Sequence, residues 1–139
     1  MKATVYHVQL NVADARVSVP FYRELLGYLE YRVTLGAGDM LGMSNGTTDF
    51  WIIQTAAGRD RSGFHRKDPG VNHVAFRVGR REDVDQFREE FLKARGIAVL
   101  YGGPREYPEY RAGYYAVFFE DPDRLKIEVA YAPGAMDVR

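Results

Sequence analysis

Residues 6–12 read Tyr-His-Val-Gln-Leu-Asn-Val, and residues 72–78 read Asn-His-Val-Ala-Phe-Arg-Val. In both stretches a histidine stands near the start of a run in which polar and apolar side chains alternate. This period of two is typical of a strand with one buried face. A repeat at this spacing predicts two copies of one structural unit in the chain. It also places two imidazoles, His7 and His73, at equivalent positions.

The repeat extends beyond these two strands. Phe21, Leu25 and Leu26 recur at helical spacing in a predicted helix that ends at Gly27. The offset that carries His7 to His73 carries Phe21 to Phe87 and Leu26 to Leu92. Because proline suits the first turn of a helix, Pro20 predicts a helix start near residue 18 or 19. The second helix should end at Gly96, and its apolar stripe comprises Val84, Phe87, Phe91 and Leu92.

Three further strands are predicted after each helix. They cover residues 29–35, 38–43 and 49–55 in the first copy, and 97–101, 113–119 and 125–131 in the second, with a turn at 120–124. The sequence therefore predicts an α+β fold of two β-α-β-β-β modules, whose mixed sheets curl around a cavity and carry the helices on their outer faces. Module one spans about 4–55 and module two about 71–131. The polar segment between them, about 56–70, is interpreted as a mobile loop that can fold over a pocket.

Composition excludes several classes of function. A chain of 139 residues is one domain's worth of material. Its formal net charge is zero, which argues against a general nucleic-acid or anionic-membrane binder. The absence of cysteine excludes disulfides, thiolate metal sites and a cysteine nucleophile. With no apolar run long enough to span a membrane and no visible signal peptide, a cytoplasmic protein is expected.

The polar face of the predicted sheets requires an explanation. Polar groups on an inner sheet face are costly unless they line a wet cavity or bind something. If the helices cover the apolar faces, the other faces carry the following side chains: His7, Gln9, Asn11, His73, Arg77 and Glu128. Two histidines and a carboxylate on rigid strands suffice to hold a divalent first-row ion (Fe, Mn, Ni, Co or Zn) with open positions. The sequence thus predicts a metal site of His7, His73 and Glu128 whose affinity falls at acid pH, because the ligands must be deprotonated.

Other residues are less specific. Tyr114 and Tyr115 straddle one strand, so one of them should face the cavity, and Tyr115 is assigned to the substrate pocket together with Trp51. Arg77 either pairs with a carboxylate or binds an anionic group of the substrate. The third histidine, His65, is interpreted as a solvated loop residue.

The chain resembles the vicinal oxygen chelate superfamily in its two modules and in three stretches of sequence. These stretches are the opening His-Val-Gln-Leu-Asn-Val-Ala-Asp, the helix Pro-Phe-Tyr-Arg-Glu-Leu-Leu-Gly and the closing Glu-Asp-Pro-Asp-Arg-Leu-Lys-Ile-Glu. That superfamily includes glyoxalase I, fosfomycin-resistance transferases, bleomycin-resistance proteins and extradiol dioxygenases. The resemblance covers nearly the whole chain as a single glyoxalase-like domain. It matches His7, His73 and Glu128 to the family's metal ligands, and it makes Gln54 a candidate fourth ligand.

What the resemblance implies is a metal-dependent lyase, isomerase, transferase or dioxygenase that chelates a small oxygen-bearing substrate. The metal would act as a Lewis acid, and Glu128 is also a candidate catalytic group. A homodimer is implied, with the site built within one chain or across two. The alternatives are a non-enzymatic small-molecule-binding module of the bleomycin-resistance type and a vestigial repeat that acts only as an interaction domain.

Overall fold

The computed structural model describes residues 1, 3–59 and 64–134, and it divides the chain into two compact units. The first unit is Met1–Phe64 and the second is His65–Arg139.

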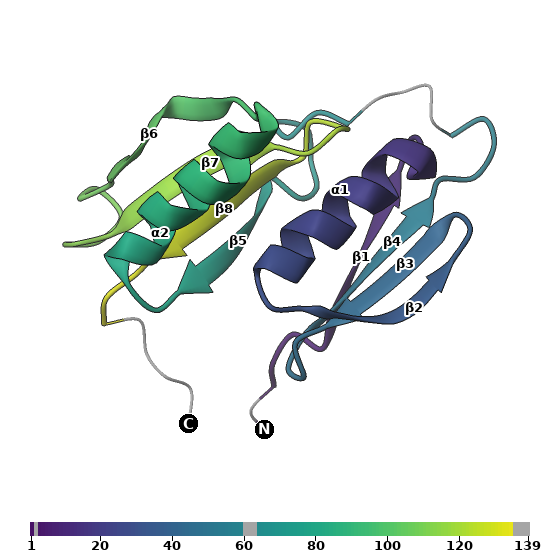
Figure 1. Cartoon of the computed structure of the whole chain (residues 1–139), viewed down its shortest axis with the longest axis horizontal. Coiled ribbons are helices and arrows are strands. Elements are labelled where there is room, and N and C mark those ends of the chain that lie inside the picture. The colour runs from purple at the N-terminus through teal and green to yellow at the C-terminus, as the bar shows by residue number, and fades with distance from the viewer. Residues whose placement is uncertain (2, 60–63, 135–139) are drawn as a thin grey trace. The chain divides into compact units, whose positions relative to one another are not determined.

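The first unit is a four-stranded mixed sheet with one helix across one face (Figure 1). Its strand order is β1-β4-β3-β2, in which β1 and β4 are parallel and the other two pairs are antiparallel. In chain order the elements are β1 (His7–Val12), α1 (Ala15–Tyr28), β2 (Arg32–Ala37), β3 (Met40–Ser44) and β4 (Asp49–Gln54).

The second unit repeats this topology, with strand order β5-β8-β7-β6 and a parallel β5–β8 pair. Its elements are β5 (His73–Val78), α2 (Arg81–Phe87), β6 (Val99–Glu106), β7 (Tyr115–Glu120) and β8 (Lys126–Tyr131). The predicted α+β fold of two β-α-β-β-β modules is confirmed, although neither sheet closes on itself.

Alternation along the strands sets the two faces of each sheet. In β1, Val12 is buried while His7, Gln9 and Asn11 are exposed. In β5, the same pattern exposes His73 and leaves Val74 half-buried. The buried cores lie between sheet and helix. They include Tyr22, Leu25, Leu26, Leu41, Phe50 and Ile52 in the first unit, and Val84, Phe87, Phe91, Leu92, Phe119, Ile127 and Val129 in the second.

The start of the first helix differs from the prediction. Helix α1 begins at Ala15, and Pro20 lies inside it rather than in its first turn. The helix starts early because Asp14 caps it: the Asp14 carboxylate accepts a hydrogen bond from the Arg16 backbone N–H at 2.9 Å. Tyr22, not Phe21, supplies the aromatic ring on the buried side.

The second helix confirms its predicted stripe, since Val84, Phe87, Phe91 and Leu92 are all buried. After α2 the chain widens into a π-helical turn over Arg88–Leu92 and tightens into a 3-10 turn over Lys93–Arg95. Gly96 ends the helix as predicted, with a φ of 64° that glycine adopts readily.

The turn that leads into the last strand is also where the sequence predicts it. One oxygen of the buried Asp121 carboxylate accepts hydrogen bonds from the backbone N–H groups of Asp123 and Leu125, at 2.9 and 2.7 Å. The Asp121 side chain therefore satisfies two backbone N–H groups of the turn and stabilises the reversal of the chain between β7 and β8. Of the predicted loop at 56–70, residues 60–63 lie outside the described residues. No described helix is both long and apolar enough to cross a membrane.

Candidate metal centre

The second unit brings together two of the three predicted metal ligands. His73 lies on β5 beside Lys126 of β8, and its ring reaches diagonally along the same sheet face to Glu128. The distance between His73 Nε2 and Glu128 Oε2 is 3.2 Å. The carboxylate side chain is only 3% exposed, whereas the imidazole is 36% exposed. In this pair the Glu128 carboxylate is therefore buried, and the His73 imidazole is the more accessible side chain.

The second oxygen of Glu128 has its own partner. Tyr114 donates a hydrogen bond from its hydroxyl to Oε1 of Glu128 at 2.6 Å, which is short enough to be a strong charge-assisted bond. Burial, together with this hydrogen bond to Glu128, raises the pKa of the Tyr114 phenol, so the group stays a donor at neutral pH. Tyr114 consequently engages Oε1 and leaves Oε2 facing the imidazole.

The outer nitrogen of the His73 ring is also held. Nδ1 of His73 lies 2.9 Å from Oδ1 of Asn72. The amide nitrogen of Asn72 in turn donates a hydrogen bond to the backbone carbonyl of Arg66 at 3.0 Å. Sequence reasoning did not single out Asn72, because a polar residue ahead of a strand gives no signal of where its side chain points.

These groups fit a divalent first-row ion by chemistry and by spacing. Ligand atoms about 2.1 Å from an ion are about 3.0 Å apart at right angles and about 3.4 Å apart in a tetrahedron. The 3.2 Å between Nε2 and Oε2 lies between these two values. Imidazole nitrogen and carboxylate oxygen are suitable donors for such ions, and each ligand has an outer hydrogen-bond partner of the kind that orients metal ligands. Within each unit, however, the described residues contain no group of three His, Cys, Asp or Glu side chains poised to hold a metal.

The first unit carries His7 on the exposed face of its sheet. Gln9 and Trp51 are paired across the parallel β1–β4 ladder on this face, and Asn11 follows two residues further along. The Trp51 ring lies over Gly42 of β3, where an added Cβ would be only 2.7 Å from it. These four predicted site residues therefore share one sheet face, which is the repeat counterpart of the face that bears His73.

Around the His73–Glu128 pair the sheet face is aromatic. Phe118 of β7 is buried, and the His73 ring meets it edge-on with the ring centroids 6.1 Å apart. Tyr101 and Tyr107 pack against Phe118 at 5.6 and 5.3 Å, and the Lys126 ammonium lies 5.3 Å from the centroid of Phe118. The Tyr107 hydroxyl is buried and has no hydrogen-bond partner among the residues that the structure describes. The face thus combines apolar rings, a cation and an unused polar group.

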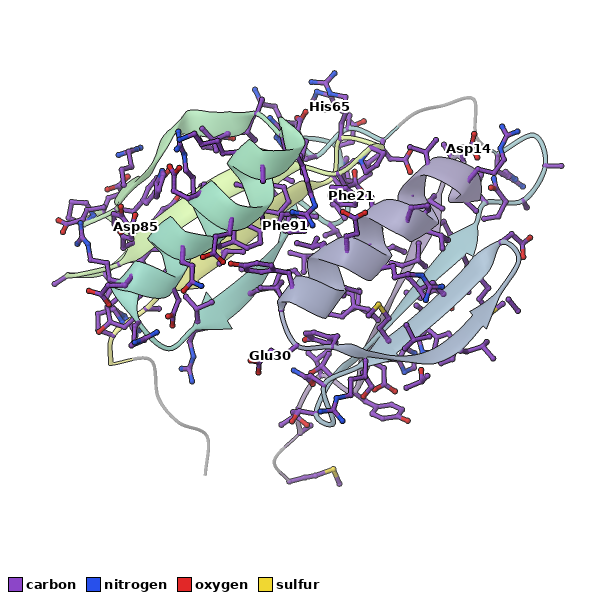
Figure 2. The ribbon with its side chains drawn as sticks, in the orientation of Figure 1. Asp14, Phe21, Glu30, His65, Asp85 and Phe91 are labelled. Atoms are coloured by element: carbon purple, nitrogen blue, oxygen red, sulfur yellow. The ribbon has the colours of Figure 1, made fainter. Side chains whose placement is uncertain are left out.

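The two neighbouring tyrosines face opposite ways, and the assignment of Tyr115 to the pocket is wrong. Its hydroxyl donates a hydrogen bond at 2.7 Å to Asp85, which Figure 2 labels on α2, and the Arg81 guanidinium lies 3.9 Å from its ring centroid. Tyr115 therefore belongs to the helix side of the sheet, while Tyr114 reaches Glu128. The register fixes this difference, because Ala116 and Phe118, on the same face as Tyr114, pair with Ala130 and Glu128 of β8.

Arg77 is exposed on β5, on the same face as His73. His65 lies in the described part of the connecting segment, where its Nδ1 accepts a hydrogen bond at 3.3 Å from the Lys67 backbone N–H. That contact agrees with the interpretation of His65 as an exposed loop residue.

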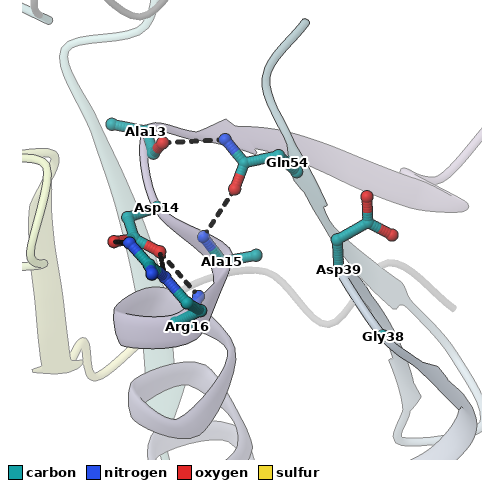
Figure 3. Close-up of a pocket in the computed structure, with 7 residues that line it drawn as sticks. All are labelled: Ala13, Asp14, Ala15, Arg16, Gly38, Asp39 and Gln54. Atoms are coloured by element: carbon teal, nitrogen blue, oxygen red, sulfur yellow. Dashed lines mark hydrogen bonds and ion pairs between the residues drawn. The ribbon is translucent and has the colours of Figure 1, made fainter. Parts of the chain in front are cut away.

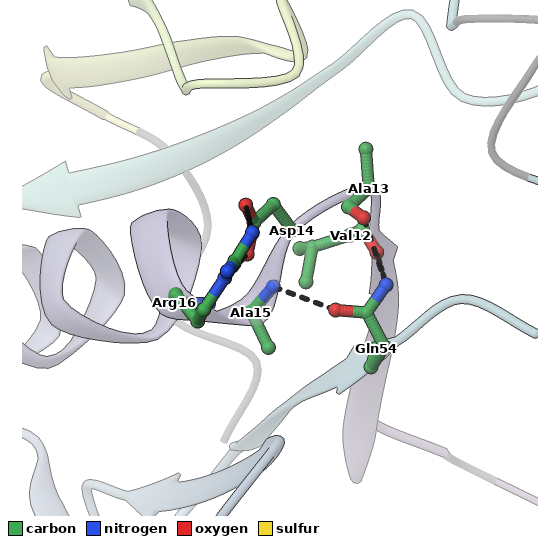
Figure 4. A network of polar contacts seen from close by, with 6 residues as sticks. All are labelled: Val12, Ala13, Asp14, Ala15, Arg16 and Gln54. Atoms are coloured by element: carbon green, nitrogen blue, oxygen red, sulfur yellow. Dashed lines mark hydrogen bonds and ion pairs between the residues drawn. The ribbon is translucent and has the colours of Figure 1, made fainter.

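Gln54 is engaged elsewhere and does not act as a fourth ligand in this geometry. Its Oε1 accepts a hydrogen bond from the Ala15 N–H at 2.7 Å, and its Nε2 donates one to the Ala13 carbonyl at 2.7 Å (Figure 4). The side chain lies on the helix side of β4, with Phe50 and Ile52, and ties β4 to the start of α1. Both ends of the amide are used by the backbone, so Gln54 is a structural clamp.

A cavity of about 600 Å³ lies beside this clamp (Figure 3). Its lining comprises Ala13, Asp14, Ala15, Arg16, Gly38, Asp39 and Gln54. The Asp14 carboxylate is bound to the Arg16 guanidinium at 2.8 Å, and the Gln54 amide is bound to backbone. Because the side chains of Asp14, Arg16 and Gln54 already have polar partners, this cavity is a weaker candidate than the His73–Glu128 face.

Comparison with known proteins shows the family and the fold of the chain. The model of the Glyoxalase/Bleomycin resistance protein/Dioxygenase superfamily matches residues 4–129. The chain is similar to an uncharacterized protein, YqjT, of Bacillus subtilis (strain 168), with 34% identity over 130 residues, which is 90% of this chain and 96% of that protein.

Solved structures give the same result. A candidate glyoxalase from Bacillus halodurans is 34% identical with a TM-score of 0.85, covering 94% of this chain and 97% of that one. A glyoxylase/bleomycin resistance protein/dioxygenase domain from Frankia sp. EAN1pec is 25% identical with a TM-score of 0.75, covering 95% and 99%. A lactoylglutathione lyase from Agrobacterium tumefaciens, 18% identical with a TM-score of 0.66 and coverage of 94% and 95%, shares the fold.

Proposed function

The chain belongs to the Glyoxalase/Bleomycin resistance protein/Dioxygenase superfamily, and on that premise we propose that it is a metal-dependent enzyme acting on a small oxygen-bearing substrate. The observation that carries the proposal is the 3.2 Å approach of His73 Nε2 to Glu128 Oε2 on one sheet face. His73 and Glu128 would hold one divalent first-row ion, with His7 as the third ligand. His7 enters the proposal from its repeat position and from its place on the polar face of its sheet.

The bound ion would supply Lewis acidity to the substrate oxygens. The chain's own residues would bind and orient the substrate. Phe118 and Tyr101 would exclude water from one side of it, and the Lys126 ammonium would attract an anionic group. Glu128, with Tyr114 on its other oxygen, would be kept in one orientation toward the imidazole.

This arrangement supports a reaction that begins with chelation of substrate oxygen, and a lyase, isomerase, transferase or dioxygenase would each begin in this way. The homodimer and the cytoplasmic location stay predictions. The second candidate is a non-enzymatic binding module, which the aromatic rings beside the pair favour because they suit a ligand without any ion.

Metal content separates the two candidates. The purified protein would be stripped with a chelator, incubated in turn with Fe²⁺, Mn²⁺, Ni²⁺, Co²⁺ and Zn²⁺, desalted and measured by elemental analysis. An enzyme of the proposed kind holds about one ion per site, and the ion is lost in His7→Ala, His73→Ala and Glu128→Ala. Glu106→Ala is the matched control, because Glu106 forms an ion pair with Arg81 away from this face. Wild-type protein that retains none of these ions would contradict the proposal and favour the binding module.

A further inference from the structure

The hydrogen bonds around His73 determine which of its ring nitrogens carries hydrogen. Asn72 contacts the ring through Oδ1, 2.9 Å from Nδ1, and contacts the Arg66 carbonyl through Nδ2, at 3.0 Å. A carbonyl oxygen only accepts hydrogen bonds, so the atom that faces Arg66 must be the amide nitrogen. The atom that faces His73 is therefore the amide oxygen, which also only accepts. It follows that Nδ1 of His73 must be the donor.

A neutral imidazole has one N–H and one lone pair. With hydrogen on Nδ1, the lone pair of His73 is on Nε2, which faces Oε2 of Glu128 at 3.2 Å. Two acceptors then face each other at a distance that either a proton or a metal cation can bridge. A histidine binds a metal through such an unprotonated nitrogen, and the hydrogen bond made by the other nitrogen selects that form.

We infer that Asn72 is a positioning residue, which holds His73 in the Nδ1–H form and so presents Nε2, beside Glu128 Oε2, to a divalent cation. The inference deepens the proposed function and rests on it for the identity of the cation. It concerns a residue that contacts neither the ion nor the substrate.

Without Asn72, the hydrogen of the neutral His73 ring should move from Nδ1 to Nε2. Asn72 is exposed, so water would replace its amide oxygen, and water both donates and accepts and imposes no form on the ring. The remaining partner, the Glu128 carboxylate, only accepts and would favour hydrogen on Nε2. In Asn72→Ala, Nε2 of His73 would therefore carry hydrogen and donate it to the Glu128 carboxylate, so this nitrogen would have no lone pair for a metal ion. Asn72→Asp keeps an acceptor for Nδ1–H and should preserve the original form.

The test is long-range ¹H–¹⁵N correlation NMR on ¹⁵N-labelled, metal-free protein, at a pH where the imidazoles are neutral. The chain has three histidines, so His7 and His65 serve as references, and a His73→Ala sample assigns the third ring. We expect hydrogen on Nδ1 of His73 in the wild type and in Asn72→Asp, and on Nε2 in Asn72→Ala. Hydrogen on Nε2 in the wild type, or an unchanged ring in Asn72→Ala, would overturn the inference. The wild-type spectrum decides even if Asn72→Ala does not fold.

Co²⁺ affinity, measured by calorimetry on the same samples, gives the second readout. Asn72→Ala should bind Co²⁺ about 10–100-fold more weakly than the wild type, and Asn72→Asp should recover most of the loss. Asn45→Ala is the matched control, since the Asn45 side chain caps the backbone N–H groups of Thr47 and Thr48 in a turn of the first unit. Equal Co²⁺ affinity in Asn72→Ala and wild type would overturn the positioning role and leave the proposed metal site standing. Wild-type protein with Nδ1–H that binds no Co²⁺ would instead overturn the proposed function.

Discussion

His73 and Glu128 stand two register positions apart on parallel strands, and their side chains still meet at 3.2 Å. His73 pairs with Lys126 in the β5–β8 ladder, while Glu128 pairs with Ala75. Ala75, whose side chain is a single methyl group, is the residue opposite Glu128 in this ladder. This diagonal contact places a nitrogen and an oxygen ligand atom side by side on one sheet face.

Replacing the carboxylate by an amide should weaken metal binding without emptying the site. Glu128→Gln keeps the shape of the side chain but removes its charge, so we expect Co²⁺ affinity to fall at least about 10-fold. Glu106→Gln, which changes an exposed side chain, should leave the affinity unchanged. Calorimetric titration of both variants checks the prediction, and equal affinities would contradict it.

Removing the Tyr114 hydroxyl should destabilise the protein. In Tyr114→Phe, Oε1 of the buried Glu128 carboxylate loses its 2.6 Å hydrogen bond, and we expect the free energy of unfolding to fall by about 1–3 kcal/mol. Tyr115→Phe is the matched control. Its partner Asp85 is exposed and can be hydrated, so the expected loss is about 0.5–1.5 kcal/mol. Urea unfolding measures both, and a larger loss in Tyr115→Phe would refute this ranking.

The protein should lose stability at alkaline pH. Burial, and then a hydrogen bond to Asp85, raises the pKa of Tyr115, and burial raises the pKa of Tyr31. The unfolded state releases these phenolic protons near the ordinary tyrosine pKa of about 10, while the folded state still holds them. The folded state then binds more protons, so this contribution to stability is complete below about pH 10 and is lost as the pH rises above it.

The urea midpoint, measured between neutral pH and about pH 11, checks this sign. Tyr115→Phe removes one of the groups and should flatten the alkaline decline, whereas Tyr6→Phe, at a side chain that is 70% exposed, should leave its slope unchanged. A midpoint that rises with pH in this range would refute the prediction.

Gln54 should matter for stability and not for metal binding. Gln54→Ala removes the two 2.7 Å hydrogen bonds that join β4 to the Ala13 carbonyl and the Ala15 N–H. We expect a loss of about 1–3 kcal/mol in the free energy of unfolding and no change in metal content. Gln86→Ala, which loses only an exposed contact with Glu90, should cost a few tenths of a kcal/mol, roughly the value of one surface helix pair. Loss of the metal from a folded Gln54→Ala protein would restore Gln54 as a ligand.

Trp51 should report on its contact with Gly42. A Cβ at Gly42 would be 2.7 Å from the Trp51 ring, so Gly42→Ala must displace the ring, at a cost of about 1–3 kcal/mol. Trp51 is the chain's single tryptophan, so a shift in its emission measures the displacement directly. Gly27→Ala, at a position where the added Cβ meets nothing within 4 Å, should leave the emission unchanged. Unchanged emission in Gly42→Ala would show that the ring does not lie where the structure places it.

The alternation of polar and apolar residues and the turn residues were sufficient to predict the two β-α-β-β-β modules. The alternation around His7 and His73 predicted both edge strands, and the Asp121 turn was predicted from its residue types. The start of α1 was misjudged because Pro20 is a strong signal for a first turn, whereas the Asp14 cap, together with Gln54 from a strand far along the chain, holds the true start.

Some features of the candidate site could likewise be predicted from the sequence, and others could not. The sequence by itself determined the repeat, the sheet face that bears His73 and the alternation that puts Glu128 on a polar face, because these follow from a period of two along a strand. Only the tertiary structure decided that Tyr114 rather than Tyr115 reaches Glu128, that Gln54 is used by the backbone, and that Asn72 holds the outer nitrogen of His73. Each of these depends on where a side chain meets a partner many residues away or on the direction in which it turns. Ladder register and hydrogen-bond geometry fix such contacts, and the order of residues along the chain does not.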